Sequence, residues 1–477
     1  MTNLPQPVAE FDTVVIGAGP CGLGAAHRFD DWNRQRPDRC HDYVVVDSRT
    51  SPGGAAASVV TAEGFTFDHG GHVLFPHQHD RVNFAEIVSN AVPAWSASPP
   101  VRGAILHGRF VPAPVQRNIH RLPLRMFSAG VWGLLTRRAP RPVRGDLDGA
   151  DLQSYLLTHF GAGLLKHVLG PMNRKMWALE LNALDSCWVR HCSGSPRPNV
   201  ADVKLGKLLL NFILNNDDPG WQRNTRVSYP ARGGTGAIWL GVANKLAPGR
   251  LLTGVGVIRI WSGAKRLELA DGRIWRYRHL ISSAPLDMLL DMIVDRPDLA
   301  RHRSSLRRSS CALIGFGVRG RAPTWLDSVH GLHVPQANVP FWRVSFPGNM
   351  SSGNVPDCCH WSVLCEVSAA AELGEPDLDC LTRKALEGLI RLNILPKAPE
   401  IVSRWTTWLK HGYPVPFLGR ATVLAQILPA LKALGILSRG RFGAWIYEAS
   451  NQDHAFFQGV EAADYVLDGR NESLFGS

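Results

Sequence analysis

Asp-Thr-Val-Val-Ile-Gly-Ala-Gly-Pro-Cys-Gly-Leu-Gly, residues 12–24, is an apolar run followed by a glycine-rich turn. The run at 12–16 predicts a buried strand, and the residues through His27 predict a helix after the turn. A second apolar run at residues 43–46 ends at Asp47. Strand, turn, helix and strand in this order predict a β-α-β unit of the doubly wound type.

Three glycines of the turn, Gly17, Gly19 and Gly22, have the spacing G-x-G-x-x-G. In a dinucleotide-binding unit the first permits a tight turn, the second lets the backbone approach a pyrophosphate, and the third lets the helix pack on the strand. Phosphates then lie at the helix N-terminus, where free N–H groups favour negative charge. Asp47 follows where a carboxylate accepts hydrogen bonds from ribose hydroxyls. We therefore expect a dinucleotide site, against the alternative of an ordinary glycine-rich turn.

Two further glycine blocks extend this expectation to a flavin. Residues 47–58 carry a Gly-Gly step shortly after the ribose acid, which is typical of FAD proteins of the glutathione-reductase and amine-oxidase kind. Residues 67–72 read Phe-Asp-His-Gly-Gly-His, and two glycines let a chain pass close to a flat ring. His72 can present an imidazole to that ring, the alternative being a buried structural histidine.

The composition excludes several classes of protein. With 477 residues, 45% of them hydrophobic, the chain can bury a large core and divides into two or three domains. Its net charge of +12 is scattered without an aromatic-basic repeat, so no nucleic-acid partner is expected. Nine cysteines without disulfide-like spacing predict reduced thiols in a cytoplasmic protein. No signal peptide and no apolar run of about 18 residues occurs, so no membrane partner is expected.

Histidines cluster between residues 69 and 79, which raises the question of a metal. Their spacing is loose and no carboxylate or cysteine completes a ligand set. No metal is therefore expected at His69, His72, His77 and His79.

Periodicity beyond the first unit predicts a mixed chain. Residues 81–215 are expected to be mostly helical. Strands are expected at 256–260, 267–269, 279–283, 311–318, 342–346 and 360–367. Helices are expected at 381–392 and from about Gly459 onward.

Four distant blocks resemble one family. They are Asn-Arg-Lys-Met-Trp-Ala (173–178), Tyr-Pro-Ala-Arg-Gly-Gly-Thr-Gly-Ala-Ile-Trp (229–239), His-Gly-Tyr-Pro-Val-Pro (411–416) and Ser-Arg-Gly-Arg-Phe-Gly-Ala-Trp (438–445), continued by Tyr447-Glu448 and Asn451-Gln452-Asp453-His454. With the glycine motif they resemble the eukaryotic-type UDP-galactopyranose mutases over residues 12–468. The block at 229–239 and the block that begins at 438 are highly specific together, but either one alone would indicate only an FAD oxidoreductase-like fold.

The resemblance implies an α/β fold in three parts. A discontinuous Rossmann-like FAD-binding domain would cover 1–90, 225–300 and 430–477, a helical substrate-cleft domain 91–224, and a mostly β substrate domain 301–429. It also implies an isomerase in which reduced FAD attacks the anomeric carbon through N5, displaces the nucleoside diphosphate and lets the ring reclose with no net redox. NADPH or NADH would reduce the flavin beforehand.

The family's site residues carry over to positions of this chain. The implied cofactor-binding residues are Gly17, Gly19, Pro20, Cys21, Gly22, Asp47, Ser48, Gly53, Gly54, Ala55, Ser58, Gly70, Gly71, His72, Val257, Arg441, Gln452 and Ala455. The implied catalytic residues are His72, Arg343, Tyr413, Arg441, Tyr447 and Asn451. The implied substrate-binding residues are Gln116, Asn173, Trp177, Arg343, Tyr413, Tyr447 and Asn451.

In these roles Arg343 meets the pyrophosphate, and Tyr413 and Tyr447 donate to it, because a diphosphate leaving group needs positive charge and donors. Asn173 and Trp177, spaced i and i+4, would face the cleft. A core position for Trp177 and a turn position for Tyr413 remain alternatives.

Several nucleotide-contacting positions depart from the family. Ala113 and Met172 stand where tyrosines are usual, His333 replaces an aromatic hydroxyl, and Met350 stands where a tyrosine donor to the phosphates is expected. We therefore expect the flavin chemistry with a different substrate, a GDP-hexose of natural-product sugar biosynthesis. UDP-galactopyranose and an amine-oxidase-like oxidation remain alternatives.

Two matters stay open in the sequence. A second phosphate-binding arginine usually follows the Cys-x-Trp step, and here either Arg190 or Arg197 could supply it. The oligomeric state is also open, with a homodimer among the alternatives.

Overall fold

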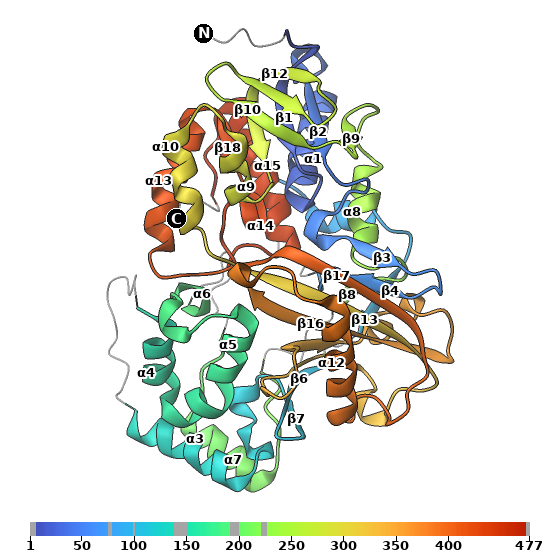
Figure 1. Cartoon of the computed structure of the whole chain (residues 1–477), viewed down its shortest axis with the longest axis vertical. Coiled ribbons are helices and arrows are strands. Elements are labelled where there is room, and N and C mark those ends of the chain that lie inside the picture. Colours follow the sequence, from blue (N-terminus) through green and yellow to red (C-terminus); the bar gives the residue numbers. More distant parts are fainter. Residues whose placement is uncertain are drawn as a thin grey trace.

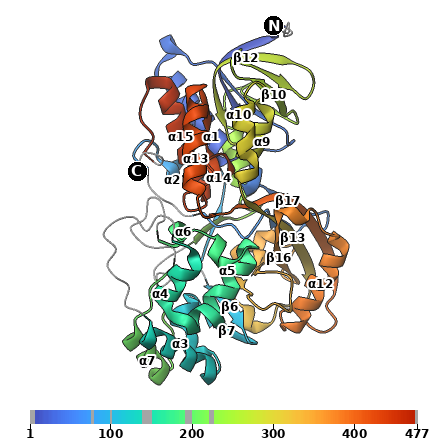
Figure 2. The same cartoon turned by 60° about the vertical axis from the view of Figure 1, so that its left-hand side comes forward.

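The computed structural model of the protein describes residues 6–74, 79–98, 101–137, 150–190, 200–220 and 227–473. Figure 1 shows three regions: one sheet with its helices at the top, a second sheet at the lower right, and a group of helices at the lower left. Figure 2, turned by 60°, shows the helical group and the second sheet side by side below the first sheet.

The first sheet is built from segments far apart in the chain. Its order is β10-β11-β12-β1-β2-β9, with β18 also paired to β12. Val15 lies opposite both Ile281 and Val45 in parallel register, so β1 is a central strand. Its apolar run is continuous because both faces are covered. The strands are β1 (Ala9–Ile16), β2 (Tyr43–Asp47), β9 (Leu251–Thr253), β10 (Val257–Trp261), β11 (Arg266–Leu269), β12 (Ile274–Ser282) and β18 (Ile436–Ser438).

Two helices from opposite ends of the chain pack closely beside this sheet: α1 (Pro20–Gln35) and α15 (Gln452–Asp468). A Cβ at Gly24 would lie 2.2 Å from the carbonyl oxygen of Phe456, and one at Gly459 would lie 1.9 Å from that of Cys21. Glycine on each helix therefore permits the contact, and α15 holds the helix that follows the glycine-rich turn. The remaining helices of this region are α8 (Gly236–Ala243), α9 (Leu286–Met292), α10 (Pro297–Ala300), α13 (Arg420–Ala433) and α14 (Gly440–Gly443).

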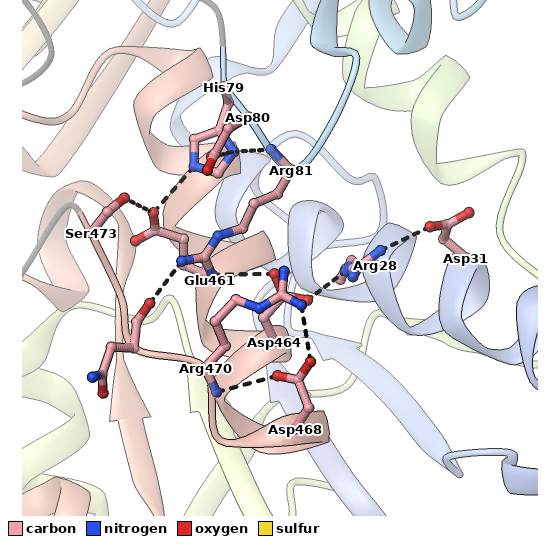
Figure 3. A network of polar contacts seen from close by, with 11 residues as sticks. Arg28, Asp31, His79, Asp80, Arg81, Glu461, Asp464, Asp468, Arg470 and Ser473 are labelled. Carbon is pink, nitrogen blue, oxygen red and sulfur yellow. Dashed lines mark hydrogen bonds and ion pairs between the residues drawn. The ribbon is translucent and has the colours of Figure 1, made fainter.

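Buried ion pairs reinforce this helix contact (Figure 3). Asp464 of α15 accepts from Arg28 of α1 at 2.6 Å and from Arg81 at 3.2 Å. Glu461, one turn earlier, lies 3.2 Å from Nε2 of His79. Both carboxylates are 0% exposed, so their partners compensate charges that water does not reach.

The second sheet has the order β17-β13-β16-β15-β14-β6-β7. Helix α12 (Leu378–Arg391) packs Ala385 and Leu389 against one face of it. The other face meets Phe65 and Phe67, which belong to the hairpin formed by β3 (Ser58–Val60) and β4 (Thr66–Asp68). The strands of the sheet are β6 (Val101–Leu106), β7 (Arg109–Pro112), β13 (Arg308–Arg319), β14 (Val329–His333), β15 (Arg343–Ser345), β16 (His360–Ala370) and β17 (Ile401–Pro414).

The helices of the third region pack on one another, and α5 also contacts β16 of the second sheet (Figure 2). A π-helical segment, Leu165–Leu169, joins α4 to α5. The elements are α3 (Leu124–Thr136), α4 (Leu152–Leu164), α5 (Gly170–Trp177), α6 (Cys187–Arg190) and α7 (Leu205–Leu214). Smaller elements between the regions are α2 (Phe84–Ser89), β5 (Trp95–Ser98), β8 (Val227–Pro230) and α11 (Pro347–Met350).

The predicted α/β class and its β-α-β unit are confirmed. The expectation that residues 81–215 are mostly helical is wrong at 95–98, where β5 pairs with β8, and at 101–112, where β6 and β7 join the second sheet through β14. The last helix begins at Gln452 and not near Gly459, because its polar first turn is buried and hydrogen-bonded. The exact domain boundaries stay predictions. Among the described residues, no helix has the length and apolar character that a membrane crossing requires.

Candidate active site

A cavity of about 730 Å³ opens at the carboxyl ends of β1 and β2. Open α/β sheets bind ligands at this edge, where the loops diverge. Gly17 and Gly19 line it from the turn after β1, and residues 47–49 line it from the end of β2. The cavity then runs past residues 254–258 toward α14 and the start of α15.

The glycine-rich turn has the geometry that phosphate binding requires. Gly17 has a φ of 97°, and a Cβ there would lie 2.3 Å from Oγ of Ser283. A Cβ at Gly22 would lie 1.8 Å from the carbonyl oxygen of Gly17. Helix α1 starts after Gly19 with no side-chain cap and no acidic residue in its first turn, so its N–H groups face the cavity edge unneutralised.

Asp47 is held rigidly at the same edge. Its carboxylate accepts from the backbone N–H of Ala18 at 2.6 Å and from that of Arg49 at 2.8 Å. Each oxygen keeps a further lone pair for a ligand hydroxyl. A cradle of glycines, a helix N-terminus and an acid at the second strand together fit a dinucleotide.

Most of the predicted cofactor residues lie together on this cavity. They are Gly17, Gly19, Pro20, Cys21, Asp47, Ser48, Gly54, Ala55, His72, Val257, Arg441, Gln452 and Ala455. The other five do not line it in the part of the chain that the structure describes. They are Gly22, Gly53, Ser58, Gly70 and Gly71.

Ser58 and the block at 229–239 meet at a buried carboxylate. Asp68 accepts from Oγ of Ser58 at 2.5 Å, from the phenol of Tyr229 at 2.6 Å and from the N–H of Thr235 at 3.0 Å. This block therefore anchors the segment that leads to Gly70, and its own residues stay outside the cavity.

A second cavity, of about 180 Å³, adjoins the first. His72 and Arg441 line both cavities, so the two meet at these side chains. Arg441 is fixed there because its guanidinium donates to the carbonyl of Ser450 at 3.0 Å. The other residues that line the second cavity are Gly71, Val73, Arg102, His330, Gly331, His333, Arg343, Ser345, Met350, Tyr413, Tyr447 and Asn451.

Glu366, which no sequence motif indicated, organises this second cavity from below. Its carboxylate accepts from Nε of Arg343 at 2.6 Å, from the phenol of Tyr413 at 3.1 Å and from the N–H of Gly71 at 2.8 Å. It is 1% exposed, and Arg343 lies directly opposite it on the neighbouring strand. A carboxylate within the apolar strand 361–367 is the signal that could have identified it.

The charges of the site follow from this arrangement. Burial lowers the pKa of Arg343, but the charge and hydrogen bonds of Glu366 outweigh it and raise the pKa overall. Burial, with Glu366 nearby, holds the pKa of Tyr413 well above 10, so the phenol stays protonated. Burial and the neighbouring Arg441 and Arg343 hold the pKa of His72 well below its usual value, so its imidazole is neutral.

Aromatic rings pack behind the tyrosines. Trp177 is 1% exposed, and its ring lies edge-on to Tyr447 with centroids 4.8 Å apart. It supports the tyrosines from behind the cavity. Asn173, on the same helix, donates to the carbonyl of Leu169 at 2.8 Å, and Gln116 donates to that of Ala201 at 2.9 Å. None of these three lines the second cavity as described, and their contact with substrate stays a prediction.

Known proteins are similar to this chain in sequence and fold. A family model of NAD(P)-binding Rossmann-like domains matches residues 15–86. A solved structure of reduced UDP-galactopyranose mutase is 33% identical, covers 99% of this chain and 97% of its own, and superposes with a TM-score of 0.88. The chain belongs to the UDP-galactopyranose mutase family.

More distant structures share the fold of this mutase-family chain. A putative protoporphyrinogen oxidase from Exiguobacterium sp. 255-15 is 14% identical, with a TM-score of 0.69 and coverage of 98% of this chain and 99% of its own. Cyclohexylamine oxidase from Brevibacterium oxydans IH-35A is 16% identical, with a TM-score of 0.64 and coverage of 96% and 99%. At these identities the likeness concerns the fold alone.

Two of the positions at which we expected a departure from the family, His333 and Met350, line the second cavity. The side chain of Arg190, all of Arg197, and His77 lie outside the described residues. Within the described residues, no group of three or more His, Cys, Asp or Glu side chains could hold a metal ion.

Proposed function

We propose that this mutase-family protein is a flavin-dependent nucleotide-sugar pyranose/furanose mutase, an isomerase that acts on a GDP-hexose. One observation carries the proposal: a dinucleotide cavity and a small arginine-lined cavity meet at His72 and Arg441. A cofactor ring and a sugar diphosphate can thus be held against each other.

FAD fits the larger cavity. Its pyrophosphate would be held at the start of α1 by the turn at Gly17 and Gly19, and its ribose by Asp47. Nδ1 of His72 is buried at the junction with no hydrogen-bond partner among the described residues, which suits a polar group of the cofactor or sugar. When bound and reduced, FAD would supply a nucleophilic nitrogen for the anomeric carbon.

The residues of the second cavity would stabilise the leaving group. Arg343 is cationic and fixed by Glu366, and a guanidinium binds phosphate oxygens through two parallel hydrogen bonds. Tyr413 is a neutral phenol that can turn its proton toward the diphosphate. The cavity thereby stabilises charge that develops as the glycosidic C–O bond breaks. The diphosphate that leaves is also the nucleophile that returns, so the same contacts serve both directions.

The choice of GDP rests on positions that are expected to contact the nucleotide and that carry other side chains here than is usual in the family. Met350 and His333 line the second cavity in place of hydroxyl donors, and Ala113 replaces a bulky ring beside Gln116. Smaller side chains around the base favour a purine. UDP-galactopyranose is the alternative substrate.

The test is turnover of a panel of UDP-, GDP- and dTDP-hexoses by protein reduced with dithionite, or with NADPH or NADH, under argon. Formation of a GDP-hexofuranose by reduced but not oxidised protein is expected, with no stoichiometric use of reductant. Turnover of UDP-galactopyranose alone would reject the GDP assignment. Stoichiometric consumption of O₂ with an amine would reject the mutase reaction itself.

A further inference from the structure

Arg102 lies in the same cavity as Arg343, although it comes from β6, a strand that the sequence did not predict. We infer that Arg102 is a second cation of the subsite that binds the diphosphate of the nucleotide-sugar. The inference rests on the proposed function and adds to it a specific recognition residue.

The strand register brings the two arginines onto one face of the sheet. Arg102 pairs with Gly331 on β14, and Gly331 pairs with Ser345 on β15. Two residues along, His333 of β14 pairs with Arg343 of β15. Residues directly opposite across strands, and residues two apart along a strand, share a face. Arg102, His333, Arg343 and Ser345 therefore point to the same side, which is the side of the cavity.

Gly331 keeps the space between them open. It is the residue that separates β6 from β15 on this face, and a Cβ built on it would lie 3.7 Å from Oγ of Ser345. Because glycine has no side chain, nothing from β14 stands between Arg102 and the Arg343 side of the cavity at this position. An anion in the cavity can thus meet both guanidiniums.

The balance of charge calls for a polyanion. Arg102, Arg343 and Arg441 line the cavity, whereas in the described part of the chain no Asp or Glu does. Burial, together with the charge of Arg343, lowers the pKa of Arg102 to about 10, so it stays cationic near neutral pH. Glu366 beneath the cavity is the ion-pair partner of Arg343. A diphosphate carries two or more negative charges, which suits a cavity lined by three guanidiniums.

The two histidines beside Arg102 do not supply this charge. Burial and the positive charge of Arg102 lower the pKa of His330 to about 4. Burial, Arg343 and Arg102 lower the pKa of His333 to about 3. Both are neutral near pH 7, and Met350 has no hydrogen to donate. Besides Arg343, and Arg441 at the junction with the larger cavity, Arg102 is therefore the described lining residue that can offer a guanidinium to a phosphate.

The experiment measures binding of inorganic pyrophosphate and of GDP to the oxidised, flavin-loaded protein by calorimetry. Pyrophosphate has no base, so it reports the diphosphate subsite whichever nucleotide is the substrate. Arg102→Ala is expected to raise the Kd for both ligands about tenfold or more, as for loss of a charged hydrogen bond. Arg102→Lys should raise the Kd less than Arg102→Ala does, because lysine keeps the positive charge although it lacks the bidentate geometry of the guanidinium.

Three controls make the result specific. Arg109→Ala removes an exposed arginine of the neighbouring strand β7 and should bind pyrophosphate as the wild type does. Guanosine, which has no phosphate, should bind Arg102→Ala and wild type equally. Arg343→Ala should weaken pyrophosphate binding in its own right, and an unchanged flavin spectrum checks the fold of each variant.

The outcomes separate this inference from the proposed function. Wild-type affinity of Arg102→Ala for pyrophosphate, with loss of binding in Arg343→Ala, would overturn the role of Arg102 and leave the mutase proposal standing. An equal loss of affinity for guanosine and for pyrophosphate in Arg102→Ala would also overturn the role of Arg102. If the wild type binds neither pyrophosphate nor any nucleoside diphosphate, the proposed function fails and the role of Arg102 fails with it. If Arg102→Ala loses its flavin, the Kd of Arg102→Lys for pyrophosphate decides whether Arg102 binds the diphosphate.

Discussion

Arg343 and Glu366 face each other on adjacent antiparallel strands, with Nε and Oε1 2.6 Å apart beneath the second cavity. Removing the carboxylate leaves a guanidinium that burial alone would disfavour. Glu366→Ala is therefore expected to lower the free energy of unfolding by about 3–5 kcal/mol, the range for breaking a buried pair. Urea unfolding of the flavin-loaded protein measures this.

Glu366→Gln keeps the size and one acceptor oxygen, so it should cost less stability but still loosen Arg343. Glu387→Ala, at an exposed position on α12, provides the matched control and should change stability by less than about 0.5 kcal/mol. An equal, small effect of the alanine variants at positions 366 and 387 would contradict the organising role of Glu366.

Gly71 allows the segment that carries His72 to pass directly over Arg343. A Cβ there would lie 2.3 Å from Oγ of Ser345 and 3.2 Å from Cζ of Arg343. Gly71→Ala should displace the guanidinium and lower kcat/KM at least about tenfold, as a displacement of roughly 1 Å does in other sites. Steady-state kinetics with the reduced protein test this. Gly206→Ala, where a Cβ meets nothing within 4 Å, should retain full activity.

Buried neutral histidines make the folded state sensitive to acid. Burial is the main cause that lowers the pKa of His69 and His330 to about 4 and that of His333 to about 3. In the unfolded chain these groups titrate near 6.5. Below that pH the unfolded state binds more protons than the folded state, so stability falls as pH decreases toward the folded pKa values.

We therefore expect the free energy of unfolding to drop between pH 7 and pH 5, by up to about 1.4 kcal/mol per pH unit for each such histidine. His333→Gln should reduce that slope in urea titrations at the two pH values. His107→Asn, at an exposed turn with a φ of 51°, should leave it unchanged. An unaltered slope in the first variant would show that His333 titrates normally in the folded protein.

The close contact of α1 and α15 gives a fourth prediction. A Cβ at Gly459 would lie 1.9 Å from the carbonyl oxygen of Cys21, a backbone atom that cannot rotate away. Gly459→Ala should cost about 1–3 kcal/mol by overpacking and should lower the flavin content of the purified protein, because α1 carries the phosphate-binding turn. Absorbance at the flavin band and urea unfolding measure the two effects. Asp468→Ala, in the exposed last turn of α15, should retain normal flavin content.

The parts of the fold with strong local patterns were predictable. The apolar run at 12–16 and the spacing of Gly17, Gly19 and Gly22 specify a buried strand, a tight turn and a helix within one short segment. The strand β17 was not predicted, because Ile401–Pro414 mixes apolar and polar side chains without alternation. It lies at the sheet edge and pairs with β13, so one side of it meets solvent and the pattern is weak.

The residues that line the candidate site differ in the same way. Residues within motifs, such as His72 and Arg441, could be proposed from the sequence because the motif itself is local, and both line the cavities. Arg102 and Glu366 lie on strands whose neighbours are distant in sequence, and the order β16-β15-β14-β6 places Arg102 in the second cavity and Glu366 beneath it. No spacing in the chain encodes that order.

The packing of α15 against α1 has a consequence for how the nucleotide cradle forms. Arg28 of α1 and Asp464 of α15 pair with each other although they lie 436 positions apart in the sequence. β18, at residues 436–438, extends the same sheet from the same distant part of the chain. The glycine-rich turn is therefore supported only after these long-range contacts have formed. Loading of the flavin thus reports that segments far apart in the sequence have come together.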